Sequence, residues 1–247
     1  MKAKTILPFV VLTLLFTTYR GAAQVFKIST SSQSALVFGD ITKTGVNNPS
    51  AGYVEYGSGV GFAFNFYFKN RLGLGLRSTG TLYTRDVEQY ETDLKAVLGI
   101  TDDQYDLTPA PGFLSFGSDF GVSYLIDLSD KWQFEPYFYL GLNILGLPES
   151  SAIYAQNGTT YQFNTKAQPY VGLSYSPGAK FNWNFSRQFG LYFSLEYNGR
   201  TYVEDNERSL SYSANSFVIA DVPRAYSINS VNLGFGLSFS FGKGLPD

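Results

Sequence analysis

The stretch Val60–Phe68 reads V-G-F-A-F-N-F-Y-F, and the stretch Val231–Phe241 reads V-N-L-G-F-G-L-S-F-S-F. In both, large apolar residues take every second position, and Gly, Ala, Ser or Asn take most places between them. Because side chains on a strand alternate faces, each stretch has one apolar, aromatic face and one small, polar face. A soluble sheet would turn charged side chains to water, and these stretches carry none. The pattern predicts a transmembrane β-barrel, whose outside meets lipid and whose inside holds polar side chains.

The composition favours the same class of protein. Aromatic residues make up 17% of the chain and charged residues only 15%, whereas soluble domains carry about 25% charged residues. Beyond the N-terminal segment no apolar run approaches the roughly 20 residues of a helical membrane span. An exported chain with this balance is typical of the bacterial outer membrane, so we predict that location. We expect outer-membrane lipid around the barrel and both termini in the periplasm.

Residues 1–23 are predicted to be a cleavable signal peptide, which leaves residues 24–247 as the barrel domain. Lys2 and Lys4 give the positive start, an apolar stretch follows, and Gly21-Ala22-Ala23 supplies the small residues of a cleavage site. The alternative is a short membrane anchor, but the apolar stretch is well below the roughly 20 residues needed to span a bilayer.

The charge balance argues against nucleic acid as a partner. Cleavage would remove Lys2, Lys4 and Arg20, so the 18 basic residues fall to 15 against 20 acidic ones, a net charge near −5. A phosphate-binding surface needs a basic excess instead. The chain has no Cys, so it forms no disulfide.

Strand-like segments alternate regularly with short turns and longer loops. The predicted strands are 27–40, 52–68, 72–84, 112–128, 132–147, 167–183, 189–202 and 225–241. This gives eight antiparallel strands in an up-and-down barrel, with three short turns on one side and four longer loops on the other. An even strand number, short periplasmic turns and longer outward loops are the usual plan of such barrels.

The alternation assigns the large apolar side chains to the outside. The predicted outward residues include Phe62, Phe64, Phe66, Phe68, Leu72, Leu74, Leu76, Phe116, Phe120, Phe138, Leu140, Leu142, Phe193, Leu195, Leu233, Phe235 and Leu237. Trp132 and Trp183 fall at the short-turn end, where indoles favour the membrane interface. The rival is a soluble lipocalin-like barrel with these residues inside, but its outside would have almost no Lys or Glu for solubility.

Charged side chains gather on the opposite face. By parity the inward charges are Glu55, Arg77, Asp119, Glu135, Lys180, Glu196 and Arg200. An eight-stranded barrel is only wide enough for side chains to fill it, and a buried unpaired charge is costly. We therefore expect ion pairs, of Arg77 with Glu55 and of Lys180 with Glu135 or Glu196. The network either plugs the tube or lines a gated path for small solutes.

Glycines inside the strands have a structural explanation. Gly73-Leu74-Gly75 lacks the Lys-Ser/Thr and the helix that would follow in a phosphate-binding loop. Small residues that relieve crowding in a narrow interior explain the pattern better.

The residue types that the chain lacks exclude several kinds of enzyme chemistry. The chain has no His and no Cys, which excludes Ser-His and Cys nucleophile arrangements and His-ligated zinc. Acid–base chemistry by carboxylates alone stays formally open, but the sequence identifies no such constellation. We predict a protein that is not an enzyme, with no cofactor and no metal site.

The longest loop is the best candidate for a specific interaction. Apolar residues at helical spacing predict a short amphipathic helix over 86–99, at the mouth of the barrel. The interaction candidates are Asp86, Glu88, Tyr90, Leu94, Asp102, Asp103 and Asp106. The loop is a lid, a contact surface for a protein or glycan partner, or a solvated acidic segment. The last three acids also suit calcium, although no EF-hand spacing supports this.

The chain resembles the outer-membrane β-barrel domain family common in Bacteroidota. The resemblance rests on the Ala22-Ala23-Gln24 signal end, the Gly-aromatic hairpins and the closing stretch Leu233–Phe241. It implies a plan similar to the small OmpA-, OmpX- and OmpW-like barrels, and a closing strand recognised by the barrel-insertion machinery. That signal usually ends on an aromatic residue, whereas here six residues follow Phe241. PorT-like members imply a further alternative, an accessory role in protein secretion.

Overall fold

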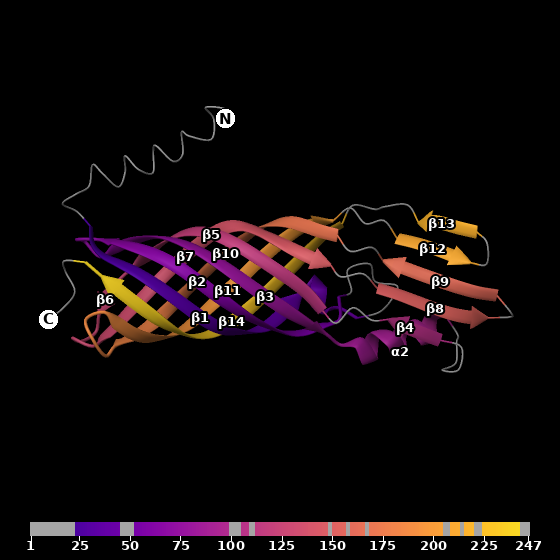
Figure 1. Cartoon of the computed structure of the whole chain (residues 1–247), viewed down its shortest axis with the longest axis horizontal. Coiled ribbons are helices and arrows are strands. Elements are labelled where there is room, and N and C mark those ends of the chain that lie inside the picture. Colours follow the sequence, from indigo (N-terminus) through magenta and orange to yellow (C-terminus); the bar gives the residue numbers. More distant parts are fainter. Residues whose placement is uncertain are drawn as a thin grey trace, which may run out of the picture.

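The computed structural model describes residues 23–44, 52–98, 105–108, 112–147, 150–156, 159–165, 168–204, 208–212, 215–219 and 224–242. Apart from Ala23, the predicted signal peptide lies outside these residues. Eight long antiparallel strands close into a barrel (Figure 1). They are β1 (Ala23–Gly39), β2 (Val54–Phe68), β3 (Leu72–Arg85), β5 (Gly112–Tyr124), β7 (Trp132–Leu147), β10 (Gln168–Asn184), β11 (Phe189–Glu204) and β14 (Arg224–Phe241). The predicted strands are confirmed to within a few residues at most ends.

Closure of the barrel comes from the pairing of the first and last strands. β1 pairs with β14 from Phe26↔Phe241 to Gly39↔Ile228, and on its other side with β2. The remaining neighbours follow chain order, with β7 against β10 and β11 against β14. The polar stretch of β1 is therefore paired along both edges, and the eight strands form an up-and-down barrel without a free edge.

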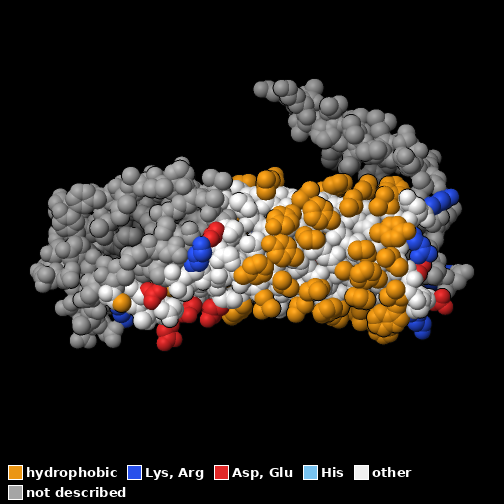
Figure 2. Space-filling view, turned by 180° about the vertical axis from the view of Figure 1, so that it is seen from behind, with side chains coloured by type: hydrophobic (Ala, Val, Ile, Leu, Met, Phe, Trp, Pro, Cys, Tyr) orange, Lys and Arg blue, Asp and Glu red, His pale blue; other side chains and the backbone are white. Residues whose placement is uncertain are grey.

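The outer wall of the barrel is apolar. The predicted outward residues are on the surface, with Phe193 50% and Phe235 58% exposed. Figure 2 shows these side chains spread over the wall and charged side chains gathered at the two ends. Trp132 and Trp183 stack on the outside at the short-turn end, with ring centroids 6.2 Å apart. In the described part of the chain, no helix combines the length and apolar character of a membrane span.

The longer loops contain structure that the sequence pattern did not predict. Five short strands form a second sheet in the order β13-β12-β9-β8-β4, beyond the end of the barrel (Figure 1). They are β4 (Tyr105–Thr108), β8 (Ser150–Gln156), β9 (Thr159–Thr165), β12 (Arg208–Tyr212) and β13 (Asn215–Ile219). The predicted helix is confirmed as α2 (Val87–Leu98). A 3₁₀ turn, η2 (Asp40–Thr42), follows β1, and the two-residue β6 (Ile126–Asp127) precedes β7.

One inward residue was assigned to the wrong face. Glu55 is exposed, not buried in the interior. The pairing of β2 with β3 shifts register between Val54 and Tyr56, so an extra residue enters β2 at this point. A bulge of this kind reverses the facing of a residue that simple alternation would place on the other side.

The barrel ends differ in what fills them. At the long-loop end an apolar cluster occupies the interior: Ile41, Val54, Tyr83, Leu145, Tyr170, Tyr202 and Ile228. Ile41 comes from η2, so the turn after β1 folds back over the end of the barrel. The cluster separates the polar interior from the loops beyond it.

Interior crowding explains the strand glycines. A Cβ atom on Gly75 would lie 2.6 Å from the Tyr139 hydroxyl and closer still to Asn65 Oδ1. Gly80, on the same strand but facing outward, would place a Cβ 3.4 Å from the Phe116 ring, an ordinary contact. The interior has no room for even one methyl group at Gly75.

We expect Gly75→Ala to lower the free energy of unfolding by about 1–3 kcal/mol, because overpacking forces neighbouring side chains and backbone to shift. Urea unfolding in lipid vesicles measures this change. Gly80→Ala is the matched control and should leave the stability unchanged or slightly raised. Equal stability of both variants would contradict a filled interior.

Candidate functional site

The barrel interior holds all the charged residues that are buried in the described part of the chain. They are Lys27, Arg77, Asp119, Glu135, Lys180, Glu196 and Arg200. Their contacts divide them into three groups, which we call the Glu135, Arg77 and Arg200 groups. The Glu135 group lies toward the short turns, and the Arg200 group lies next to the apolar cluster.

The Glu135 group joins two lysines on one carboxylate. Lys27 Nζ, from β1, donates a hydrogen bond of 3.0 Å to Glu135 Oε2 on β7 and another of 2.7 Å to Asn182 Oδ1. Tyr67 donates from β2 to the other oxygen of Glu135 at 2.7 Å. Lys180 Nζ lies 3.5 Å from that same oxygen. The carboxylate is fully buried and is contacted from three other strands, β1, β2 and β10.

The Arg77 group has the opposite balance, with one guanidinium between two carboxylates. Arg77 on β3 donates to Asp119 Oδ2 from Nε and Nη2, at 3.1 and 2.7 Å, and also pairs with Glu196 on β11. Ser174 donates to Asp119 Oδ1, and Tyr137 donates to Glu196 Oε2 at 2.9 Å. Charge-assisted bonds of this kind are the stronger class of protein hydrogen bonds.

The Arg200 group has a cation but no carboxylate in direct contact among the described residues. Arg200 donates to Asn198 Oδ1 at 2.9 Å, to Ser115 Oγ at 2.9 Å and to the Tyr83 hydroxyl. Tyr202 belongs to the apolar cluster and donates to Asn143. The guanidinium therefore donates its hydrogen bonds to neutral side-chain oxygens, directly below the apolar cluster.

The structure brings six of the seven predicted inward charges into the interior, with partners that differ from the prediction. Arg77 was expected to pair with Glu55, which is wrong, because that residue faces outward; it pairs with Asp119 and Glu196 instead. Lys180 pairs with Glu135. We did not predict Lys27 as an inward charge, although alternation along the first strand places its side chain on the inner face.

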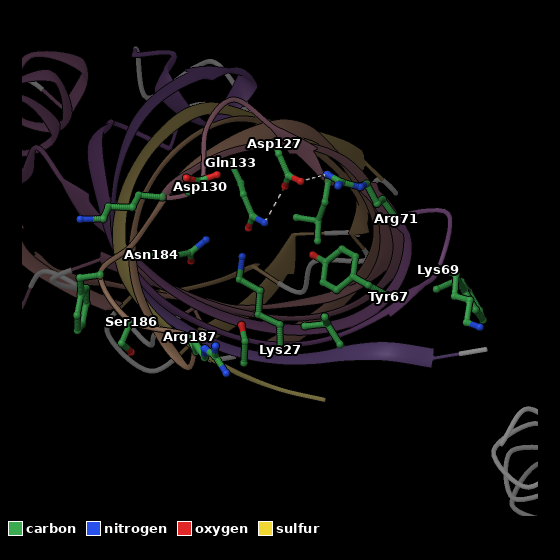
Figure 3. Close-up of a pocket in the computed structure, with 16 residues that line it drawn as sticks. Lys27, Tyr67, Lys69, Arg71, Asp127, Asp130, Gln133, Asn184, Ser186 and Arg187 are labelled. Carbon is green, nitrogen blue, oxygen red and sulfur yellow. Dashed lines mark hydrogen bonds and ion pairs between the residues drawn. The ribbon is translucent and has the colours of Figure 1, made fainter. Parts of the chain in front are cut away.

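A wide cavity opens at the short-turn end of the barrel. It has a volume of about 620 Å³ and reaches from the turns to Lys27 and Tyr67. Figure 3 shows Lys27, Gln133 and Asn184 pointing into it, and Asp127 between Arg71 and Gln133. The cavity forms a polar vestibule that ends at the Glu135 group.

The predicted loop residues hold α2 against the barrel. Asp86 accepts a hydrogen bond of 2.8 Å from the Gln89 backbone N–H and so caps the helix. Tyr90 packs against Tyr53, and the Arg85 guanidinium lies 3.8 Å from the Tyr90 ring centroid. Tyr53 also donates to Asp93 at 2.8 Å. The helix lies beside the end of the barrel, close to β4 (Figure 1).

Other predicted loop residues contribute less to this attachment. Leu94 is buried and Glu88 is exposed. Asp102 and Asp103 lie outside the described residues, and Asp106 is placed only by its backbone pairing with Ile153. Among the residues that the structure describes, no group of three or more His, Cys, Asp or Glu could hold a metal ion. The calcium alternative at the three aspartates stays a prediction.

No family model matches this chain, and no curated protein sequence matches it. Solved structures do. Ail, the attachment invasion locus protein of Yersinia pestis, is 15% identical with a TM-score of 0.42, over 88% of this chain and 99% of that one. Neisserial surface protein A is 12% identical with a TM-score of 0.42, over 90% and 100%. OprG from Pseudomonas aeruginosa is 14% identical with a TM-score of 0.39, over 90% and 97%. Likeness at this level assigns neither a family nor a function.

Asp40 fastens η2 to the last strand at the long-loop end. Its carboxylate accepts hydrogen bonds from Lys43 Nζ at 2.7 Å and from the Ser227 hydroxyl and backbone N–H at 2.7 and 3.1 Å. The Lys43 bond first, and then the Ser227 bonds, hold the pKa of Asp40 below its ordinary value. The carboxylate form thus supports the turn that carries Ile41 into the apolar cluster.

This contact should make stability depend on pH. Because the folded-state pKa is lowered, the stabilisation is complete above the unfolded pKa of about 4 and is lost as the pH falls through the lower folded value. We expect wild-type stability to fall more steeply than that of Asp40→Asn between pH 5 and pH 3, with a difference below about 1 kcal/mol for a partly exposed group. Urea unfolding at stepped pH measures it. Lys43→Gln should give an intermediate slope, and identical slopes for all three would contradict the assignment.

Proposed function

We propose that this protein is an outer-membrane β-barrel with a closed interior, which acts through the sheet and helix beyond the barrel as a contact surface for a protein or glycan partner. The observation that carries the proposal is the charge network that fills the interior.

The apolar wall supports a place in the membrane. Monomeric soluble proteins rarely expose a contiguous apolar patch of more than a few hundred Å², whereas this wall runs around the barrel. The stacked Trp132 and Trp183 suit the boundary of headgroups and hydrocarbon. A membrane crossing needs about 9–11 residues of tilted strand, and the long strands have between 13 and 18. The excess length supports a barrel that projects beyond the lipid at the long-loop end.

The filled interior supports a closed barrel. Each group takes side chains from opposite walls, as Arg77 on β3 does when it pairs with Glu196 on β11. Opening a path would separate buried ion pairs and strand their charges, which costs about 3–5 kcal/mol for a broken pair. The apolar cluster around Tyr83 and Tyr202 then adds a second barrier to ions.

The outer surface supports a role in contact. The five-stranded sheet is built from three of the four longer loops, and α2 belongs to the same longest loop as β4. Binding residues are disproportionately found on loops that a rigid scaffold holds in place. The closing strand adds the insertion machinery as an expected transient partner. An accessory role in secretion would use this same outer surface.

The conductance of the refolded protein in a planar bilayer tests the closed interior. We expect no steady conductance from the wild type, and none after deletion of 88–106, because the barrier lies in the interior and not in the loop. The double variant Arg77→Ala/Tyr83→Ala should give cation-selective openings, since it leaves Asp119 and Glu196 without their counter-ion and also opens the apolar cluster. Arg71→Ala, in the vestibule, is the control that stays closed. Steady wild-type conductance would overturn the proposal in favour of a solute path, and opening by the deletion alone would make the loop a lid.

Cysteine labelling in cells tests the location and the contact surface. The chain has no Cys, so Glu88→Cys and Lys131→Cys each carry a single thiol, at the two ends of the barrel. A membrane-impermeant maleimide with a photo-crosslinker should label Cys at 88 in intact cells, and illumination should give a defined adduct. Cys at 131 should react only after the outer membrane is permeabilised. Labelling of 131 in intact cells would contradict the orientation, and labelling of 88 without any adduct would contradict the contact role.

A further inference from the structure

The three short connections between strands give one end of the barrel a basic rim. They span 69–71, 125–131 and 185–188. Arg71 and Asp127 form an ion pair with each other. The charges that remain are three cations against one carboxylate, so the rim has an excess of two positive charges. These remaining residues are Lys69, Lys131 and Arg187 against Asp130.

The excess cations are exposed, and the acidic groups lie over the vestibule. Lys69, Lys131 and Arg187 are all exposed to the surroundings of the barrel end. Figure 3 shows Asp127 and Asp130 within the ring of strands, whereas Lys69 extends away from the cavity, outside that ring. The rim therefore presents positive charge to whatever surrounds this end of the barrel.

Every one of these three cations lies next to an outward aromatic side chain. Aromatic rings at the end of a membrane-spanning strand favour the boundary between headgroups and hydrocarbon. A long basic side chain reaches beyond that boundary while its stem covers apolar surface. A phosphate group at this depth would meet both a cation and a ring. The pairs are Lys69 with Phe68, Lys131 with Trp132, and Arg187 with Phe185 and Phe189.

The aromatic surface beside two of the turns is continuous. Trp132 stacks on Trp183, Trp183 contacts Phe185 with ring centroids 5.9 Å apart, and Phe185 stacks on Phe189 at 6.4 Å. All four rings are between 40% and 50% exposed. A backbone hydrogen bond of 2.8 Å from the end of β10 to the Lys131 carbonyl holds the two turns together. The surface thus offers room for acyl chains, with cations on the turns at its edge.

The opposite end of the apolar wall has acidic neighbours instead. Phe38 lies two residues from Asp40, and Tyr56 directly follows the exposed Glu55. Both rings are exposed, at 40% and 51%. A phosphate group would be repelled there and attracted at the short-turn end. A zwitterionic headgroup carries its own ammonium group and gains less from excess cations, so the rim favours a headgroup with a net negative charge.

We propose that the basic rim selects anionic phospholipids, of the phosphatidylglycerol type, from the leaflet that surrounds the short turns. The phosphodiester accepts hydrogen bonds from Lys131 and Arg187, and the acyl chains pack against the Trp132–Trp183 pair. This inference rests on the membrane location proposed above and adds which lipid the barrel prefers there. One basic residue near an anionic surface favours association about fivefold, and salt screens this attraction.

The fluorescence of the two tryptophans tests the preference without any added label. Trp132 and Trp183 are the only Trp residues of the chain, and both belong to the proposed surface. The mature protein is refolded into mixed vesicles of phosphatidylcholine and phosphatidylglycerol, in which one lipid or the other is brominated so that its acyl chains quench a neighbouring Trp. We expect phosphatidylglycerol to associate with this surface about fivefold more strongly than phosphatidylcholine at low salt, and a ratio near one at high salt.

The variant Lys131→Gln/Arg187→Gln should bring the low-salt ratio close to one. Both residues are exposed and lie in turns, so the buried charge network stays intact. Lys43→Gln/Lys95→Gln is the matched control, because it removes the same charge at the long-loop end and should keep the wild-type ratio.

The outcomes separate this inference from the membrane location on which it rests. Equal quenching by the two lipids in the wild type would overturn the lipid preference and leave the membrane location intact. A preference that persists in Lys131→Gln/Arg187→Gln, or that falls equally in both double variants, would also overturn it, because these two cations would then not hold the lipid. Absence of quenching by either lipid would overturn the preference together with the membrane location.

Discussion

The narrow interior is the constraint on which the rest of this structure depends. An eight-stranded barrel leaves room only for side chains, so inward groups meet partners across the barrel as well as on the neighbouring strands. Glu135 on β7 meets Lys27 on β1, and Arg77 on β3 meets Glu196 on β11. Where one side chain is long, the residue opposite must be small, as at Gly75. Glycine positions and charge positions are thus two consequences of the same limited width.

The two ends of the interior meet the surroundings differently. At the short-turn end the vestibule reaches Lys27 and Tyr67 of the Glu135 group. At the long-loop end the apolar cluster and η2 cover the Arg200 group. The interior charges therefore lie on the vestibule side of the apolar cluster. The second sheet and α2 lie on the far side of that cluster, so the outer surface and the interior are separate parts of the molecule.

Sequence alternation sufficed for the strands and their faces, because the side-chain period of a strand does not depend on its partners. It failed at Glu55, where a register shift adds one residue to β2. It also failed for the partners of Arg77. Asp119 lies directly opposite Arg77 on the neighbouring strand β5, in a register that the sequence alone does not give. Glu196 lies across the barrel, and such contacts depend on the tilt and stagger of the strands. The strands β9 and β12 alternate apolar and polar residues but are only seven and five residues long. The pairing of β9 with β12, which belong to different loops, emerges only once the barrel brings the loops together.

The polar interior needs a reason, because buried ion pairs are often no more stable than apolar side chains of similar size. Export supplies one. A strand with apolar residues on both faces would read as a continuous hydrophobic run, and long runs of that kind are inserted as membrane helices. An outer-membrane barrel must therefore keep one face of each strand polar, and a narrow barrel must then neutralise what it buries. In an exported barrel a charge network of this kind follows from export and closure alone, so it is not in itself a sign of transport.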